Sequence, residues 1–151
     1  MKATILYLDD DLQNLNSFKA NMRDSFNILI ASTPVEAYNL IHENEVQIII
    51  TDQRMPAMSG SEFLETMANE FPNIQRILLT GVADWKSVVE AVNKGKVSKI
   101  ITKPFNFSEL RNMISEGLEQ FAKSLEKEQL ISNLKKQNQQ FEFILRQRLL
   151  S

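Results

Sequence analysis

The stretch VQIIITDQRMPAMSG (residues 46–60) joins a short apolar run to a polar segment. The run 46–51 is apolar on both faces and too short for a buried helix, which predicts a strand in the interior of a parallel sheet. Asp52 follows this run directly. The stretch therefore predicts a buried strand that places a carboxylate at its carboxyl end.

Four other short runs rich in Ile, Leu and Val occur along the chain, at residues 4–8, 27–31, 74–80 and 97–102. The segments between them have apolar residues at helical spacing. Five strands that alternate with five helices predict a doubly wound α/β fold with a parallel sheet. Right-handed crossovers then place helices on both faces of that sheet.

Short polar residues mark the predicted helix starts. Thr33 and Glu36 are spaced as a capping box at the start of the second helix. Asp84 is the predicted N-cap of a helix that stops at Gly95, and Ser108 is the predicted N-cap of the last helix.

Composition limits the class of protein. The 151 residues are 43% hydrophobic and 24% charged, which is ordinary for a globular domain with a helical extension. A net charge of −2 gives no general attraction to nucleic acid or to anionic membranes. The absence of cysteine excludes disulfides, thiolate metal sites and a thiol nucleophile. Without a membrane-spanning run or a signal peptide, we expect a cytoplasmic protein.

Polar residues stand at the carboxyl ends of four predicted strands, where open parallel sheets bind their ligands. They are Asp9, Asp10 and Asp11 after the first strand, Asp52 after the third, Thr80 at the fourth and Lys103 after the fifth. Taken alone, the acidic triplet is either a solvated turn or a cation site. With the other strand ends included, the pattern predicts one shared site.

The residue types suit phosphoryl chemistry. Clustered carboxylates without Cys or a suitable His favour a hard cation with oxygen ligands, and Mg²⁺ is the leading candidate. Asp52 can serve as a carboxylate nucleophile toward phosphorus. Thr80 can donate to a phosphoryl oxygen, and Lys103 can neutralise another. Asp11 is instead predicted to cap the first helix, residues 12–22.

Four motifs carry a family resemblance: ILYLDDD (5–11), IIITDQRMPAMSG (48–60), ILLTG (77–81) and ITKPF (101–105). In order and spacing they resemble the receiver domain of two-component response regulators, over residues 1–122. The resemblance implies a flavodoxin-like fold with strand order 2-1-3-4-5. Receivers usually end with their fifth helix, and the residues that follow Gly117 here predict that this helix continues as a long C-terminal helix.

The resemblance also implies roles for individual residues. Asp52 matches the phosphoacceptor, and Asp9 and Asp10 match the acidic pair that binds Mg²⁺ together with Asp52. Arg54 would add its backbone carbonyl to the metal ligands. Thr80 matches the switch hydroxyl.

Further matches lie around the same site. Lys103 matches the lysine that contacts the phosphoryl group, and the peptide bond to Pro104 is cis in the family. Met55, Pro56 and Gly60 match the loop that shapes the site. The implied phosphoryl donor is a phosphohistidine on a sensor histidine kinase or a phosphotransfer protein. The implied chemistry is self-phosphorylation and slow autodephosphorylation, so the resemblance predicts a signalling domain without an external substrate.

One position departs from the family. Receivers usually have Tyr or Phe three residues before the lysine, and this chain has Ile100. The usual movement of that ring is therefore not available as a readout. Signalling through a packing change of the fourth and fifth helices is the alternative.

Residues 123–151 are predicted to be a helical extension, either a coiled coil or a signalling helix. Ile131, Leu134, Asn138, Phe141 and Leu145 alternate by three and four, as in a heptad seam with Asn at one a-like position. The seam predicts a homodimer through this helix. The excess of Lys and Arg here fits a solvated coiled-coil exterior better than nucleic-acid binding.

Two other functions remain open from the sequence. In an aspartyl-phosphate phosphohydrolase, D-x-D often follows the first strand, as Asp9 and Asp11 do here, but Leu12 and Gln13 do not continue that motif. A degenerate receiver that acts only as a coiled-coil scaffold would not need a complete phosphorylation site. This chain keeps the whole set: the acidic pair, Asp52, Thr80 and Lys103.

Overall fold

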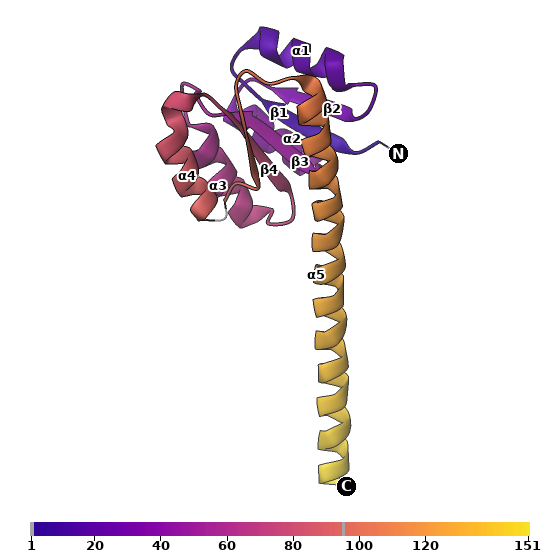
Figure 1. Ribbon diagram of the computed structural model, residues 1–151. Helices are drawn as coiled ribbons and strands as arrows, with labels where there is room; N and C mark the ends of the chain where they lie inside the picture. Colours follow the sequence, from indigo (N-terminus) through magenta and orange to yellow (C-terminus); the bar gives the residue numbers. More distant parts are fainter. Residues whose placement is uncertain (1, 95) are drawn as a thin grey trace. The chain divides into compact units, whose positions relative to one another are not determined.

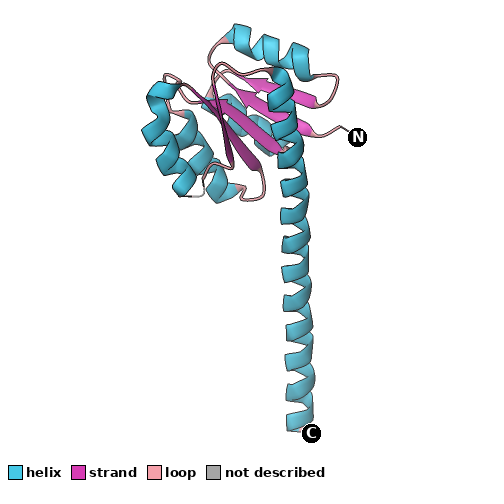
Figure 2. Ribbon diagram, in the orientation of Figure 1, coloured by secondary structure: helices cyan, strands magenta, loops and turns pink. Residues whose placement is uncertain are grey.

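The computed structural model describes residues 2–94 and 96–151. The chain divides into two compact units, residues 1–121 and 122–151. The first unit is an α/β domain whose helices lie on both sides of a central sheet (Figures 1 and 2). No helix in the described part of the chain is long and apolar enough to span a membrane.

The sheet has five parallel strands in the order β2-β1-β3-β4-β5. The strands are β1 (Thr4–Leu8), β2 (Asn27–Ala31), β3 (Ile48–Asp52), β4 (Gln75–Thr80) and β5 (Lys99–Thr102). Every residue of β3 and β4 is buried, as the two-sided apolar pattern predicts for central strands. Asp52 is the last residue of β3, because its pairing with Leu79 extends the strand by one residue beyond the predicted end. The predicted flavodoxin-like fold and strand order are confirmed.

The helices are α1 (Leu12–Met22), α2 (Pro34–Glu43), α3 (Gly60–Glu70), α4 (Trp85–Asn93) and α5 (Phe107–Leu150), with a 3₁₀ turn η1 (Val82–Asp84). Buried side chains of α2, α3 and α4 pack on one face of the sheet. Those of α1 and of the first turns of α5, including Leu110 and Ile114, pack on the other face. Each face therefore has its own apolar core.

Two predicted helix caps are present. The Oδ1 atom of Asp11 accepts hydrogen bonds from the backbone N–H groups of Gln13 at 2.8 Å and Asn14 at 3.4 Å. The hydroxyl of Thr33 accepts from the backbone N–H of Glu36 at 3.2 Å. In both cases the cap satisfies an N–H group that has no partner within the helix.

The other two predicted caps have different outcomes. Asp84 is the N-cap residue of α4, as predicted, although its side chain makes no capping hydrogen bond and its carboxylate pairs with Arg54. The prediction for Ser108 is wrong. Helix α5 starts before Ser108, and the Oδ1 of Asn106 accepts from the backbone N–H of Glu109 at 2.7 Å. The predicted stop at Gly95 lies outside the described residues.

The second unit, residues 122–151, consists of the C-terminal part of α5. Its large apolar side chains are exposed, and they include four of the five residues of the predicted heptad seam. The exposed residues are Leu125, Leu130, Ile131, Leu134, Phe141, Phe143, Ile144, Leu145, Leu149 and Leu150.

His42 links the ends of α2 and α3. Its Nε2 lies 2.9 Å from a carboxylate oxygen of Glu70, and its Nδ1 lies 3.0 Å from the backbone carbonyl of Tyr38. Both ring nitrogens face acceptors, so the doubly protonated ring satisfies the geometry best. The hydrogen bond to Tyr38, helped by Glu70 and opposed by partial burial, raises the pKa of His42 above its ordinary value.

The ordinary pKa of histidine is 6.5, and these contacts raise it. We therefore expect His42, the single histidine of this chain, to titrate above pH 6.5 in an NMR experiment. Because the pKa of His42 is higher in the folded state than in the unfolded state, its protonation stabilises the fold. This contribution to the free energy of unfolding is complete below the unfolded pKa and is lost as the pH rises through the folded pKa. Glu70→Gln should lower the pKa of His42 and remove part of this pH dependence from the melting temperature. An unchanged titration in Glu70→Gln would contradict the assignment.

Candidate functional site

The carboxyl edge of the sheet gathers the predicted acidic residues. Asp9 and Asp10 follow β1, and Asp52 ends β3. One carboxylate oxygen from each of the three lies within 4.8 Å of the others. Lys103, after β5, places its Nζ 2.5 Å from the Oδ1 of Asp52. Four residues predicted at three strand ends therefore lie together at the carboxyl edge of the sheet.

Thr80 and Arg54 stand differently. The buried hydroxyl of Thr80 donates to the backbone carbonyl of the next residue, Gly81, at 3.1 Å, and this bond does not involve the acidic cluster. The side chain of Arg54 extends away from the acidic cluster to Asp84. Asp11 is occupied by the α1 cap, as the sequence predicts.

Asp9 is fully buried and tightly held. Its Oδ1 accepts from the backbone N–H of Asp11 at 2.9 Å. Its Oδ2 accepts from the hydroxyl of Tyr7 at 2.6 Å and from Nδ2 of Asn14 at 3.1 Å. Neither Tyr7 nor Asn14 is among the site residues predicted from the sequence. A signal for Tyr7 was present, because residues two apart on a strand point to the same face.

The electrostatics of the cluster favour a bound cation. Burial, aided by the negative charge of Asp9, raises the pKa of Asp52, while Lys103 acts in the opposite direction. Burial and the hydrogen bond to Asp9 also raise the pKa of Tyr7 far above its ordinary value, so its hydroxyl stays protonated and donates. Three converging carboxylates against one ammonium leave negative charge to be neutralised. An all-oxygen donor set of this kind fits Mg²⁺.

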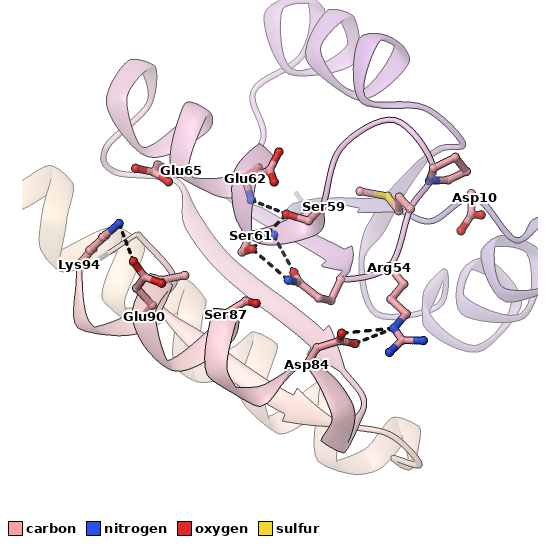
Figure 3. A pocket seen from close by; sticks show the side chains of 14 residues that line it. Asp10, Arg54, Ser59, Ser61, Glu62, Glu65, Asp84, Ser87, Glu90 and Lys94 are labelled. Atoms are coloured by element: carbon pink, nitrogen blue, oxygen red, sulfur yellow. Dashed lines mark hydrogen bonds and ion pairs between the residues drawn. The ribbon is translucent and has the colours of Figure 1, made fainter.

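The backbone around Asp52 is held by the start of α3. Gln53 is buried, and its side chain accepts from the backbone N–H of Ser61 at 2.8 Å and donates to the hydroxyl of Ser61 at 3.0 Å (Figure 3). The backbone N–H of Gly60 donates to the carbonyl of Gln53 at 3.0 Å. A Cβ on Gly60 would lie 2.2 Å from the carbonyl oxygen of Asp52, so only glycine fits there. This clamp was not predicted from the sequence.

A groove of about 690 Å³ runs beside the site between α3 and α4. Near its end, Nε of Arg54 pairs with Asp84 at 3.0 and 3.3 Å (Figure 3). Arg54 lies two residues after Asp52, and Asp84 precedes α4. The pair therefore connects the loop after the candidate phosphoacceptor to the start of α4.

Two features beside Lys103 bear on the resemblance. The Lys103–Pro104 peptide bond is cis, as the resemblance implies. Ile100 is partly buried and packs against the core that α2, α3 and α4 cover. An aliphatic side chain thus occupies the position of the usual aromatic ring.

Comparisons with known proteins agree with this geometry. The family model described as response regulator receiver domain matches residues 5–115. The hydrogenase transcriptional regulatory protein HoxA of Cupriavidus necator is 30% identical over 118 residues, which are 78% of this chain and 24% of that protein. The transcriptional regulatory protein ZraR of Klebsiella oxytoca is 28% identical over 76% of this chain and 26% of its own length. This chain thus spans about a quarter of the curated relatives that it matches.

Solved structures show the same fold at higher coverage. A chain described as adenylate cyclase from Rhodopirellula baltica has a TM-score of 0.83 and 32% identity, covering 87% of this chain and 98% of its own. A receiver domain protein (CheY-like) from Methanospirillum hungatei has a TM-score of 0.76 and 29% identity, covering 82% and 99%. The parallel sheet, the acidic cluster at its carboxyl edge and the family match lead to one conclusion: this chain belongs to the response regulator receiver domain family.

Proposed function

We propose that Asp52 accepts a phosphoryl group from a phosphohistidine donor in a Mg²⁺-dependent reaction, and that the domain then changes conformation to control a partner or output domain. The observation that carries this proposal is the convergence of Asp9, Asp10 and Lys103 on the carboxylate of Asp52. The donor is a sensor histidine kinase or a phosphotransfer protein.

The transfer step uses the ionised form of Asp52. A carboxylate oxygen of Asp52 attacks phosphorus, the P–N bond of the phosphohistidine breaks, and the imidazole leaves with the bonding electron pair and takes up a proton. Lys103 neutralises charge on the phosphoryl group after it releases its hydrogen bond to Asp52. Thr80 donates its hydroxyl to a phosphoryl oxygen.

The residues that would hold Mg²⁺ are Asp9, Asp10, Asp52 and the backbone carbonyl of Arg54. The ion supplies neutralisation of the charge that develops on the phosphoryl oxygens. The protein positions the nucleophile through the Gln53–Ser61 clamp and holds the Asp9 carboxylate in place through three hydrogen-bond donors. The chain's own chemistry is then limited to its phosphorylation and slow dephosphorylation.

Acetyl phosphate tests the proposal without knowledge of the kinase. We expect intact mass spectrometry to show one phosphoryl group with Mg²⁺ and none with a chelator. Borohydride reduction and peptide mapping should place the group on Asp52. A label on Asp9 with turnover of small phosphoesters would instead identify a phosphohydrolase. No label on a chain that binds Mg²⁺ would favour the scaffold.

For residues 122–151 we propose pairing with the same segment of a second copy. The support is the exposed apolar side chains at heptad spacing, including Leu134 at 51% and Phe141 at 62% exposure. Most of the stability of helices in proteins comes from the packing of an apolar face, which pairing would provide for this segment. Asn138 at an a-like position would favour one parallel register.

Light scattering on the full chain tests this pairing. We expect a dimer for the wild type and for Lys136→Ala, which changes a position outside the seam. Leu134→Ala should shift the equilibrium toward monomer by about 2 kcal/mol or more, because it removes a buried leucine side chain from the interface. A wild type that stays monomeric with and without beryllofluoride and Mg²⁺ would overturn the proposal.

A further inference from the structure

We infer that Tyr7 is a positioning residue for the metal site: its hydroxyl, with Asn14, fixes which oxygen of Asp9 faces the cation. The inference rests on the proposed function, in which Asp9 is a Mg²⁺ ligand. It assigns to the middle of β1 a role that neither the motifs nor the family match specifies.

The hydrogen bonds to the two oxygens of Asp9 are unequal. Oδ2 accepts from Tyr7 at 2.6 Å and from Asn14 at 3.1 Å, whereas within residues 2–94 and 96–151 Oδ1 accepts only from the backbone N–H of Asp11 at 2.9 Å. A carboxylate oxygen has about two lone-pair sites. Oδ2 is therefore saturated by protein donors, and Oδ1 keeps one lone pair for a cation.

The donors themselves are held in place. Tyr7 is buried, and its ring packs against Phe18 with ring centroids 4.5 Å apart. Its place on β1 is fixed between Ile30 and Ile50 of the neighbouring strands. The hydroxyl thus has little freedom to move away from Asp9. A rotation of the Asp9 carboxylate that presents Oδ2 to the cation would break two hydrogen bonds of a fully buried side chain.

This arrangement orients a ligand before the ion arrives. Partners behind a metal ligand generally set its orientation and its basicity. Two donors on one oxygen also offset the charge of a fully buried carboxylate beside Asp52. Tyr7 therefore holds Asp9 in one orientation as a ligand, although Tyr7 itself touches neither metal nor phosphoryl group.

The test compares two conservative variants of the full chain. Tyr7→Phe removes only the hydroxyl that Asp9 accepts from. Tyr38→Phe makes the same chemical change at the only other tyrosine, which is exposed and donates to Glu70 on α3. By isothermal titration calorimetry we expect Tyr7→Phe to weaken Mg²⁺ binding about tenfold, as for other partners of metal ligands. Tyr38→Phe should bind Mg²⁺ as the wild type does.

A spectroscopic readout separates positioning from a loss of stability. In Tyr38→Phe protein labelled with ¹³C at the tyrosine Cζ, the single NMR signal belongs to Tyr7. We expect Mg²⁺ to shift this signal with the same dissociation constant that calorimetry gives. A general loosening of the fold would not couple the signal of Tyr7 to the ion.

Asn14→Ala provides a second route if Tyr7→Phe fails to fold. Asn14 is exposed on α1, and its replacement removes the other donor to Oδ2. Weaker Mg²⁺ binding in either folded variant supports the inference. Binding equal to the wild type in both variants would overturn it and leave the proposed function intact. A wild type that does not bind Mg²⁺ would overturn the proposed function, and the inference with it.

Discussion

The Asp52→Asn variant is expected to take no phosphoryl group from acetyl phosphate and, without Mg²⁺, to unfold at a higher temperature than the wild type. The carboxylate of Asp52 is buried beside Asp9, and these two effects raise its pKa despite the pairing with Lys103. The folded wild type therefore carries an unfavourable charge that the neutral amide removes. Lys103 is 37% exposed and keeps contact with water after its partner is neutralised.

The pH dependence of this difference has a definite sign. The folded pKa of Asp52 is raised, so its favourable contribution exists below the unfolded pKa and is lost as the pH rises through the folded pKa. The stability advantage of Asp52→Asn should therefore be small in acid and should grow toward neutral pH. Urea unfolding across this range measures it.

Mg²⁺ provides the control for this prediction. A ligand that binds only the folded state raises its free energy of unfolding, and at a given ligand concentration the gain is larger for the tighter binder. Added Mg²⁺ should raise the melting temperature of the wild type more than that of Asp52→Asn. The amount by which the variant melts above the wild type should then shrink or change sign. A variant that is less stable than wild type at neutral pH without Mg²⁺ would show that the ion pair with Lys103 outweighs burial.

Gly60→Ala is expected to lower the free energy of unfolding by about 3 kcal/mol, at the upper end of the range for overpacked sites. The new Cβ would lie 2.2 Å from the carbonyl oxygen of Asp52 and 2.9 Å from its carbonyl carbon. These are backbone atoms at the end of β3, so they cannot move aside as a flexible side chain would. Urea unfolding followed by circular dichroism measures the loss.

Gly81→Ala is the matched control for Gly60→Ala. Gly81 adjoins Thr80 in the same site, but apart from Gly81 and its two chain neighbours no atom of the described residues lies within 4 Å of a Cβ built on it. We expect little change in stability for this variant. If the two alanine variants lost equal stability, the close approach of Gly60 to Asp52 would not be the cause.

The sequence predicted the fold, and the carboxyl ends of the strands to within one residue, because both depend on local patterns. Runs that are apolar on both faces must be buried on both faces, and the parallel topology then brings Asp9, Asp10, Asp52 and Lys103 together. No knowledge of side-chain contacts is needed for that step.

The pairings across elements could not be predicted in the same way. Arg54 and Asp84 are 30 residues apart in the sequence. Asp is a preferred N-cap residue, but the carboxylate of Asp84 pairs with Arg54 and makes no capping hydrogen bond. Gln53 and Ser61 meet only because the loop between them closes on α3. Such contacts depend on tertiary geometry, which overrides local preference.

The hydrogen bond from Thr80 to the carbonyl of Gly81 limits how much free energy Thr80 can contribute to a conformational change on phosphorylation. To reach a phosphoryl oxygen, the hydroxyl must give up its neutral bond to the carbonyl of Gly81. A neutral bond is worth about 1 kcal/mol and a bond to a charged group about 2 kcal/mol, so the exchange gains about 1 kcal/mol. That gain shifts the ratio of two conformations only about fivefold. A nearly complete shift of population needs about 5.5 kcal/mol. Most of the bias must therefore come from other contacts that phosphorylation changes, and the Arg54–Asp84 pair beside α4 is placed to contribute.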